Sequence, residues 1–157
     1  MALLQVGLST CGICGRTIDS AQETVLFAAF VVNAADPVYR FSDGVFHRCC
    51  IEADVSGRRC LGLWEQFLAS RGPSGRPCDA CERPIVDFRD HLGFGVLSSI
   101  PDSPLFFLNF VQLHRSHVAE WDRIGGVVEL LRDSYRDGEL SGPEAERLVQ
   151  DLESLGW

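Results

Sequence analysis

The stretch Cys11-Gly-Ile-Cys14, completed by His47-Arg-Cys-Cys50, decides how the first part of this chain folds. Each segment places its first and last residues, both potential metal ligands, at positions i and i+3. The arrangement returns as Cys78-Asp-Ala-Cys81 and His114-Arg-Ser-His117, and the interval from Cys81 to His114 equals that from Cys14 to His47. Cysteine thiolates and histidine imidazoles, in sets of four, are the ligands of structural zinc sites. The spacing therefore predicts two zinc sites.

The two ligand sets lie in an internal repeat, because one constant shift along the chain relates a first repeat (11–55) to a second repeat (78–122). All four ligand positions align without a gap. Five other residues also recur: Arg16, Ile18, Phe27, Pro37 and Arg48 return as Arg83, Ile85, Phe94, Pro104 and Arg115. Such agreement indicates one supersecondary unit that occurs twice. We expect a structural zinc ion in each repeat, held by three cysteines and one histidine in the first and by two of each in the second.

The cysteine count fits metal binding better than disulfides. The chain has seven cysteines, an odd number, and its start lacks the basic residues and sustained apolar stretch of a secretory signal. Disulfide frameworks belong to oxidising compartments, so we expect a cytoplasmic protein with reduced thiols. Cys49 and Cys60 have no counterpart in the repeat, and we expect both to be buried as small apolar residues.

Composition narrows the classes of partner. The 157 residues carry 22 acidic side chains and 14 basic ones, all arginine, for a formal charge of −8. So acidic a chain is poorly suited to binding a nucleic-acid backbone. Its longest apolar run, 25–32, is too short to span a bilayer. We therefore expect a protein partner, which could carry a basic surface, and neither nucleic acid nor a membrane.

Strand-forming residues and turn signals outline the first repeat. The expected elements are a strand over 24–32, a hairpin of 38–41 and 45–46 around the Asp-Gly turn at 42–44, a helix over 47–55 that Ser56-Gly57 ends, and a helix over 59–70 with Leu61, Trp64 and Leu68 on one face. The Gly/Pro-rich segment 71–77 follows and is the expected linker between the repeats.

The second repeat is expected to follow the same plan and then to continue into two helices. The expected elements are strands near 92–99 and 105–113, a helix from His114, a helix with the apolar stripe Ile124, Val127, Val128, Leu131 and Tyr135, and a helix with Ala145, Leu148, Val149 and Leu152 that runs to Leu155. Ser141-Gly-Pro-Glu144 predicts a capping box for the last helix, with Pro143 near its start. The predicted divisions are 1–70, the linker 71–77, 78–137, and a C-terminal helix in 138–157 packed on the second unit.

This order of elements resembles the treble-clef zinc finger, in which a knuckle and a β-hairpin precede a helix whose first turn supplies the last two ligands. The resemblance covers most of both repeats and rests on the eight cysteine and histidine ligands. It implies an α+β fold of two tandem treble-clef units with a C-terminal helical hairpin. The superfamily includes adaptors, ribosomal proteins, nucleic-acid binders and nucleases, so the resemblance implies a fold and no particular activity.

The second repeat also resembles the zinc-bearing HNH nucleases, which are themselves treble clefs. That family places Asp-His on the first hairpin strand and Asn before the second ligand pair, as Asp90-His91 and Asn109 stand here. Its general base would map to His91. The metal-binding residue expected just after the ligand pair is Val118, which cannot bind a catalytic metal. The resemblance therefore implies a degenerate relative and no enzyme activity.

The segment 133–144, DSYRDGELSGPE, partly matches a calcium-binding EF-hand loop. Loop positions 1, 5, 6, 8, 9 and 12 carry preferred residue types, and helices are expected on both sides. Tyr135 stands at position 3, however, and offers no carboxylate. We favour a corner between two helices, closed by Gly138 and a Ser141 cap, and keep calcium as the weaker alternative.

These patterns favour a non-catalytic, zinc-stabilised protein–protein interaction module. Phe106, Phe107, Phe110 and Trp121 crowd the second repeat, and any that stay exposed would form an interaction patch. One alternative is a nucleic-acid-associated or degenerate HNH-like nuclease protein. A further alternative is an acidic inhibitor or immunity-type protein that occupies a basic surface, because the last helix carries Glu144, Glu146, Asp151 and Glu153.

Overall fold

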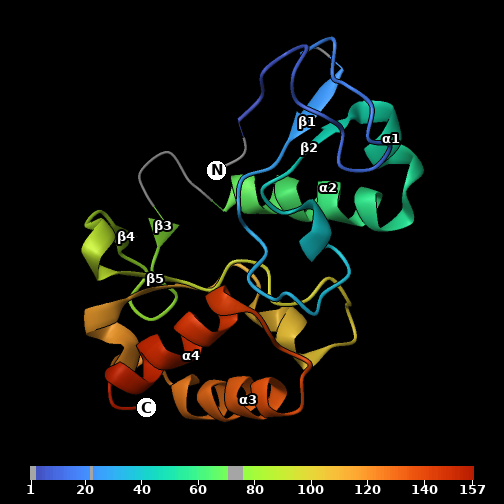
Figure 1. Cartoon of the computed structure of the whole chain (residues 1–157). Helices are drawn as coiled ribbons and strands as arrows, with labels where there is room; N and C mark the ends of the chain where they lie inside the picture. Colours follow the sequence, from blue (N-terminus) through green and yellow to red (C-terminus); the bar gives the residue numbers. More distant parts are fainter. Residues whose placement is uncertain (1–2, 22, 71–75) are drawn as a thin grey trace.

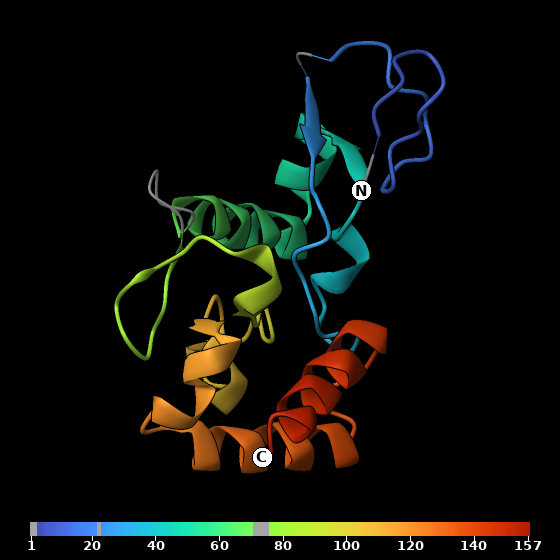
Figure 2. The same ribbon diagram turned by 90° about the vertical axis from the view of Figure 1, so that its left-hand side faces the viewer.

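Short strands and helices alternate in the computed structural model of the chain, which describes residues 3–21, 23–70 and 76–157. The strands are β1 (Thr24–Leu26), β2 (Val45–His47), β3 (Arg76–Pro77), β4 (Pro84–Ile85), β5 (His91–Gly93) and β6 (Gln112–His114). The α-helices are α1 (Arg48–Ala53), α2 (Val55–Ala69), α3 (Ile124–Arg136) and α4 (Pro143–Ser154). Single-turn or short 3₁₀ helices are η1 (Tyr39–Phe41), η2 (Phe88–Asp90), η3 (Pro104–Leu108) and η4 (Arg115–Glu120). Figure 1 shows the N-terminal elements stacked above the α3–α4 pair, and Figure 2 shows the same arrangement turned by 90°.

Each repeat contains one short antiparallel strand pair. In β1–β2, Val25 lies opposite Phe46, and in β5–β6, Leu92 lies opposite Leu113. All four side chains are buried, as expected of apolar residues that face the core at alternate strand positions. The remaining pair, β3–β4, flanks the cysteine turn of the second repeat. The fold is therefore α+β, with a strand pair and a helical turn beside each Cys/His cluster and the helix pair α3–α4 at the C-terminal end.

The backbone follows the same course in both repeats. The N–H of Phe27 donates to the carbonyl of Gly44 (3.0 Å), and at the equivalent place in the second repeat Phe94 donates to Val111 (2.9 Å). Equivalent residues are also buried in both cores: Ile18 and Ile85, Val25 and Leu92, Phe27 and Phe94, Val38 and Leu105, Phe41 and Leu108, Phe46 and Leu113, Ile51 and Val118. Burying one such side chain stabilises the fold by roughly 1.5–3 kcal/mol.

The hairpin predicted around 42–44 is wrong. Residues 39–41 form η1, and the partner of β2 is β1, across a long loop. The strand predicted over 24–32 ends at Leu26, because neighbouring residues Phe30 and Val31 are both buried and do not alternate. Their N–H groups donate to Ser42 Oγ at 3.1 and 3.2 Å instead.

The second repeat departs from the predicted strands in the same way. The strand expected near 92–99 is β5 alone, and 105–113 contains η3 and only the start of β6. Asn109 takes the place of Ser42, and its Oδ1 accepts the N–H groups of Leu97 (2.8 Å) and Ser98 (3.1 Å). The helix predicted from His114 is a 3₁₀ helix, η4.

The helices after β2 are divided two residues earlier than predicted. Ser56-Gly57 lies inside α2, and the break falls at Asp54, whose carboxylate accepts the Gly57 N–H (2.9 Å) and caps α2. The buried face of α2 consists of Gly57, Cys60, Leu63 and Phe67. Leu68, predicted to share the apolar face, is 45% exposed.

The C-terminal helix pair is confirmed, although its predicted cap is wrong. Ile124, Val127, Val128 and Leu131 of α3 and Ala145, Leu148 and Leu152 of α4 are buried, whereas Tyr135 is exposed. Pro143 begins α4 as predicted, but the N-cap is Gly142 (φ 98°), without a side-chain hydrogen bond. Ser141 is held by its backbone instead, because its N–H donates to Asn33 Oδ1 (3.0 Å).

A buried polar junction joins the two repeats and the C-terminal helix pair. Asn33 Nδ2 donates to the carbonyls of Leu97 (2.9 Å) and Glu139 (2.8 Å). Beside it, the Val32 N–H donates to the Val96 carbonyl (2.9 Å), and the Asp36 carboxylate accepts the Ser99 N–H (2.6 Å). The apolar residues form two core clusters, each built mainly from one repeat, although Val96 of the second repeat belongs to the cluster of the first.

The predicted linker 71–77 lies largely outside the described residues, and the four divisions of the chain stay predictions. Positions 76–77 of that segment form β3 and pair with β4. Of the helices in the described part of the chain, none is long and apolar enough to cross a membrane.

Candidate metal centres

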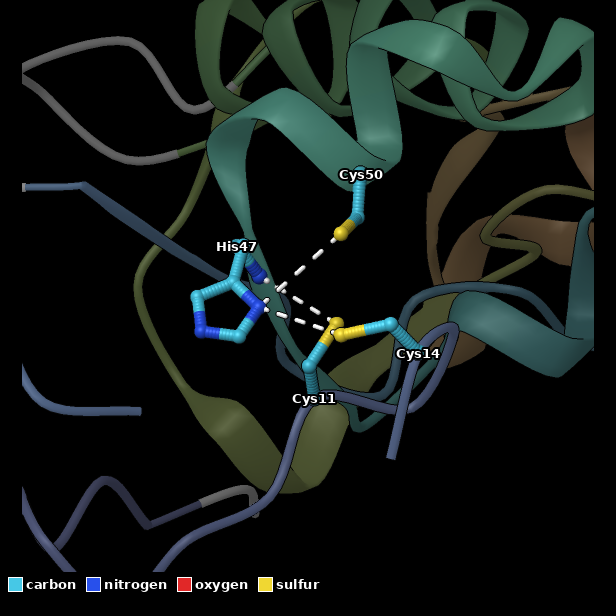
Figure 3. A group of neighbouring side chains, drawn as sticks. All are labelled: Cys11, Cys14, His47 and Cys50. Atoms are coloured by element: carbon cyan, nitrogen blue, oxygen red, sulfur yellow. Dashed lines mark hydrogen bonds between the residues drawn. The ribbon is translucent and has the colours of Figure 1, made fainter. Parts of the chain in front are cut away.

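The side chains of the first repeat that were predicted as ligands meet in one cluster. This first tetrad consists of Cys11, Cys14, His47 and Cys50, whose ligand atoms all lie within 4.8 Å of one another. The two N-terminal cysteines come from a tight turn, His47 ends β2, and Cys50 lies in the first turns of α1. Figure 3 shows the three sulfurs and the His47 ring turned toward one point.

Backbone hydrogen bonds fix the cysteine turn of the first tetrad. The Cys11 N–H donates to the Arg16 carbonyl (2.9 Å), and the Gly15 N–H donates to the Cys11 carbonyl (2.9 Å). Gly15 has φ 69°, a conformation that glycine adopts without strain. The His47 N–H points at Cys11 Sγ (3.4 Å), and His47 Nδ1 lies 3.4 Å from Cys14 Sγ.

The three thiols of the first tetrad differ in acidity. The Arg16 N–H, together with its guanidinium, lowers the pKa of Cys14 to about 6, whereas burial raises the pKa of Cys50 to about 12. Burial would also raise the pKa of Cys11, but backbone N–H groups, led by that of Cys14, lower it below the ordinary thiol value. Near neutral pH without metal, Cys14 is therefore a thiolate and Cys50 a thiol, and a metal ion that binds must displace the Cys50 proton.

The second tetrad repeats this geometry with one thiol fewer. It consists of Cys78, Cys81, His114 and His117, again with all ligand atoms within 4.8 Å. The His114 N–H points at Cys78 Sγ (3.3 Å), as in the first tetrad. Cys81 Sγ lies 3.5 Å from Nδ1 of His114 and 3.1 Å from Nδ1 of His117.

Each tetrad could hold one metal ion. Thiolate and imidazole donors in groups of four are the ligand sets of structural zinc sites. Among residues 3–21, 23–70 and 76–157, these are the groups of three or more histidine, cysteine or acidic side chains close enough to share a metal.

The residues that suggested HNH chemistry have other contacts. His91 Nε2 lies 2.5 Å from Oε1 of Gln112, and the Asp90 carboxylate accepts the N–H (2.9 Å) and hydroxyl (3.0 Å) of Ser116. Asn109 holds the loop at 97–98 as described above. Val118 is 1% exposed and belongs to the core.

The segment 133–144, which partly matches a calcium-binding loop in sequence, forms the end of a helix and a turn. It begins inside α3, which ends at Arg136, and Gly138 turns the chain with φ 80°. The carboxylates of Asp133 and Asp137 both pair with Arg136, at 2.9 and 3.5 Å. The described residues gather no third ligand here.

The two cysteines outside the tetrads differ. Cys60 is fully buried as predicted, and burial raises the pKa of its thiol to about 12. Cys49 is exposed, so its predicted burial is wrong. It lies on α1 next to the ligand position Cys50, and Ile51 is the residue that this helix buries.

Sequence reasoning missed the contact between Arg16 and the first tetrad. The guanidinium interacts with Cys14, which together with Cys50 and Cys49 raises the pKa of Arg16 above its ordinary value. The recurrence of Arg16 as Arg83 was the available signal, but it does not reveal which of the two contacts a thiolate.

Comparisons with protein-family models, with curated proteins and with solved structures found no match for the chain.

Proposed function

We propose that the chain is a tandem treble-clef protein that binds two structural zinc ions and serves as a non-catalytic protein–protein interaction module. The donor sets support zinc, because thiolate and imidazole in closed tetrahedral groups of four are its usual structural ligands. Each repeat is also short for a self-sufficient core, and a bound metal ion supplies folding free energy that so small an apolar cluster lacks.

The observation that carries the interaction role is a pair of exposed apolar side chains on the second repeat. Val86 is 86% exposed and Phe88 is 87% exposed, just after the cysteine turn. The equivalent residues in the first repeat are Asp19 and Ala21, which are also exposed. The aligned positions of the first repeat therefore carry an acidic and a small residue, and large apolar side chains kept in water are typical of a binding surface.

A double substitution that copies the first repeat tests this role. In Val86→Asp/Phe88→Ala, capture of the partner from the native cell should fall by roughly tenfold or more. Zinc content and thermal unfolding should be unchanged. The matched control is Val55→Ser, which removes an apolar side chain from the surface of α2, where it is also exposed. Equal capture by the double variant and the original protein would contradict the proposal.

The absence of catalysis belongs to the same proposal. The buried Val118 supports it, because a valine side chain has no atom that can ligate a second metal ion. The purified protein should not cut DNA or RNA with magnesium, manganese or nickel. Cleavage that His91→Ala abolishes would favour the nuclease alternative.

The charge distribution supports a second candidate, an acidic surface that occupies a basic partner. The segment 120–157 contains ten acidic side chains and four arginines, so it carries −6 of the total charge of −8. Contacts between such a surface and a basic partner weaken as salt increases. If capture of the partner is lost in high salt but is unchanged in Val86→Asp/Phe88→Ala, the result would favour this candidate over the apolar surface.

A further inference from the structure

We infer that the first tetrad is a site of reversible thiol oxidation: a peroxide oxidises Cys14, Cys50 closes a Cys14–Cys50 disulfide, and the metal ion is released from this tetrad alone. The inference rests on the proposed zinc binding and concerns the regulation of that site. Two differences between the tetrads support it.

The first difference is the number of thiols. The ligand from the helical turn is Cys50 in the first tetrad and His117 in the second. The Sγ atoms of Cys14 and Cys50 lie within 4.8 Å of each other, and Figure 3 shows the Cys50 sulfur turned toward the cysteine turn. In the second tetrad, by contrast, the groups that face Cys81 Sγ are imidazole nitrogens: Nδ1 of His117 at 3.1 Å and Nδ1 of His114 at 3.5 Å.

The second difference is access for a small oxidant. Cys14 is exposed, whereas Cys81 is half-buried. The residue after Cys14 is Gly15, where even an added Cβ would meet no atom within 4 Å. The equivalent residue is Glu82 in the same left-handed conformation, so the second turn carries a side chain and a negative charge at this point.

Exposure also decides which of the two thiols is oxidised first. Cys14 is exposed and Cys50 is half-buried, and a peroxide must reach the sulfur that attacks it. The exposed Cys14 is therefore the expected point of attack.

The chemistry balances with a peroxide as the oxidant. The Cys14 thiolate attacks one oxygen of hydrogen peroxide, the O–O bond breaks, and sulfenic acid forms while hydroxide leaves as water after protonation. The Cys50 thiolate then attacks the Cys14 sulfur, the S–S bond forms, and the S–O bond breaks with loss of a second water. Two thiols lose two electrons to one peroxide, and a dithiol reductant reverses the change.

Cys50 is a better second thiol than Cys11. Cys11 is buried, and its sulfur receives the His47 N–H in the cysteine turn. Cys50 is half-buried on α1. The disulfide would remove two of the four ligands, and a site with two ligands left does not retain a structural zinc ion.

The experiment uses the full-length, zinc-loaded protein and hydrogen peroxide. Zinc release is followed with a chelating dye, and disulfides are mapped by mass spectrometry after the free thiols are alkylated. Cys50→His copies His117 and keeps four ligands, and Cys49→Ser copies Ser116 and serves as the matched control. We expect one zinc equivalent to leave, a Cys14–Cys50 disulfide to appear, and a dithiol with added zinc to restore the site.

Cys50→His should retain two zinc ions and release them at least roughly tenfold more slowly, because it lacks the second thiol. Cys49→Ser should behave like the original protein. Equal release rates from both tetrads, a disulfide that excludes Cys50, or unchanged release in Cys50→His would overturn the inference. An untreated protein without zinc would instead overturn the proposed zinc binding, so the two failures are distinguishable.

Discussion

The two tetrads place their first three ligands on the same turn and strand end but differ in their last ligand. In both, the second ligand pair begins with a histidine whose N–H points at the buried cysteine of the turn, at 3.4 and 3.3 Å. The last ligand is a cysteine in one and a histidine in the other. The comparison teaches that main-chain hydrogen bonds place the first ligands alike, while the last ligand is a thiolate on an α-helix in one repeat and an imidazole on a 3₁₀ helix in the other.

What covers each repeat also differs. The first repeat packs against the long helix α2, where Trp64 and Phe67 meet Phe30 with ring centroids 5.0 and 5.6 Å away. The second repeat packs against α3 and α4, whose buried residues belong to its core cluster. Each small repeat thus needs helices from outside the shared pattern to complete its core.

Loss of one tetrad should have the largest effect. Cys14→Ser should lose one metal ion and unfold the first repeat, because structural zinc supplies about 10–16 kcal/mol of apparent binding free energy in small domains. The second core cluster contains no ligand of the first tetrad, so the second repeat should stay folded. NMR spectra of Cys14→Ser and Cys81→Ser check this. Collapse of all signals in both variants would mean that the repeats do not fold separately.

The next largest effect is expected from a substitution at the buried polar junction between the repeats. Asn33→Ala leaves the Leu97 and Glu139 carbonyls without their donor in a buried place, and should lower the free energy of unfolding by about 2–4 kcal/mol. Asn109→Ser, which copies Ser42, is the control and should cost less. Denaturant unfolding measures both. A negligible effect of Asn33→Ala would show that the two repeats are not coupled through this residue.

The two cysteines outside the tetrads, Cys49 and Cys60, should differ by a smaller amount in their effect on stability. Cys60→Ser places a hydroxyl among buried apolar groups and should cost about 1–3 kcal/mol. Cys49→Ser should leave stability unchanged because the side chain is exposed. Thermal unfolding of the zinc-loaded variants checks the pair, and equal losses would contradict the difference in burial.

The last comparison concerns the pH dependence of metal affinity at the two tetrads. A free imidazole titrates near 6.5 and a thiol near 8.5, and burial raises the pKa of Cys50 to about 12. Metal must therefore displace a proton from Cys50, whereas the equivalent ligand of the second tetrad is an imidazole, the ligand type that gives up its proton more easily. As pH falls from about 8.5 to 6.5, affinity should drop more steeply at the first tetrad, by up to about tenfold more per pH unit. Chelator competition on Cys81→Ser and Cys14→Ser isolates each site, and a steeper drop at the second tetrad would contradict the prediction.

The ligand spacing predicted both clusters because one constant shift along the chain constrains all eight ligand positions at once. The helix pair α3–α4 was predictable from its apolar stripes. The hairpin at 42–44 was not, because Ser42 Oγ takes the N–H groups of Phe30 and Val31, and such a contact leaves no periodic signal. The cap predicted at Ser141 was wrong for a similar reason. The Ser141 N–H donates to Asn33 Oδ1, and Asn33 lies far from it in the sequence.

Native mass spectrometry of the protein, purified without added metal or chelator, tests the central claim most directly. If each tetrad holds a structural ion, the observed mass will exceed that of the reduced chain by two zinc ions, and Cys14→Ser and Cys81→Ser will each lose one. A chain with one zinc or none, or one that has lost four hydrogens because Cys11–Cys14 and Cys78–Cys81 disulfides have formed, would contradict it.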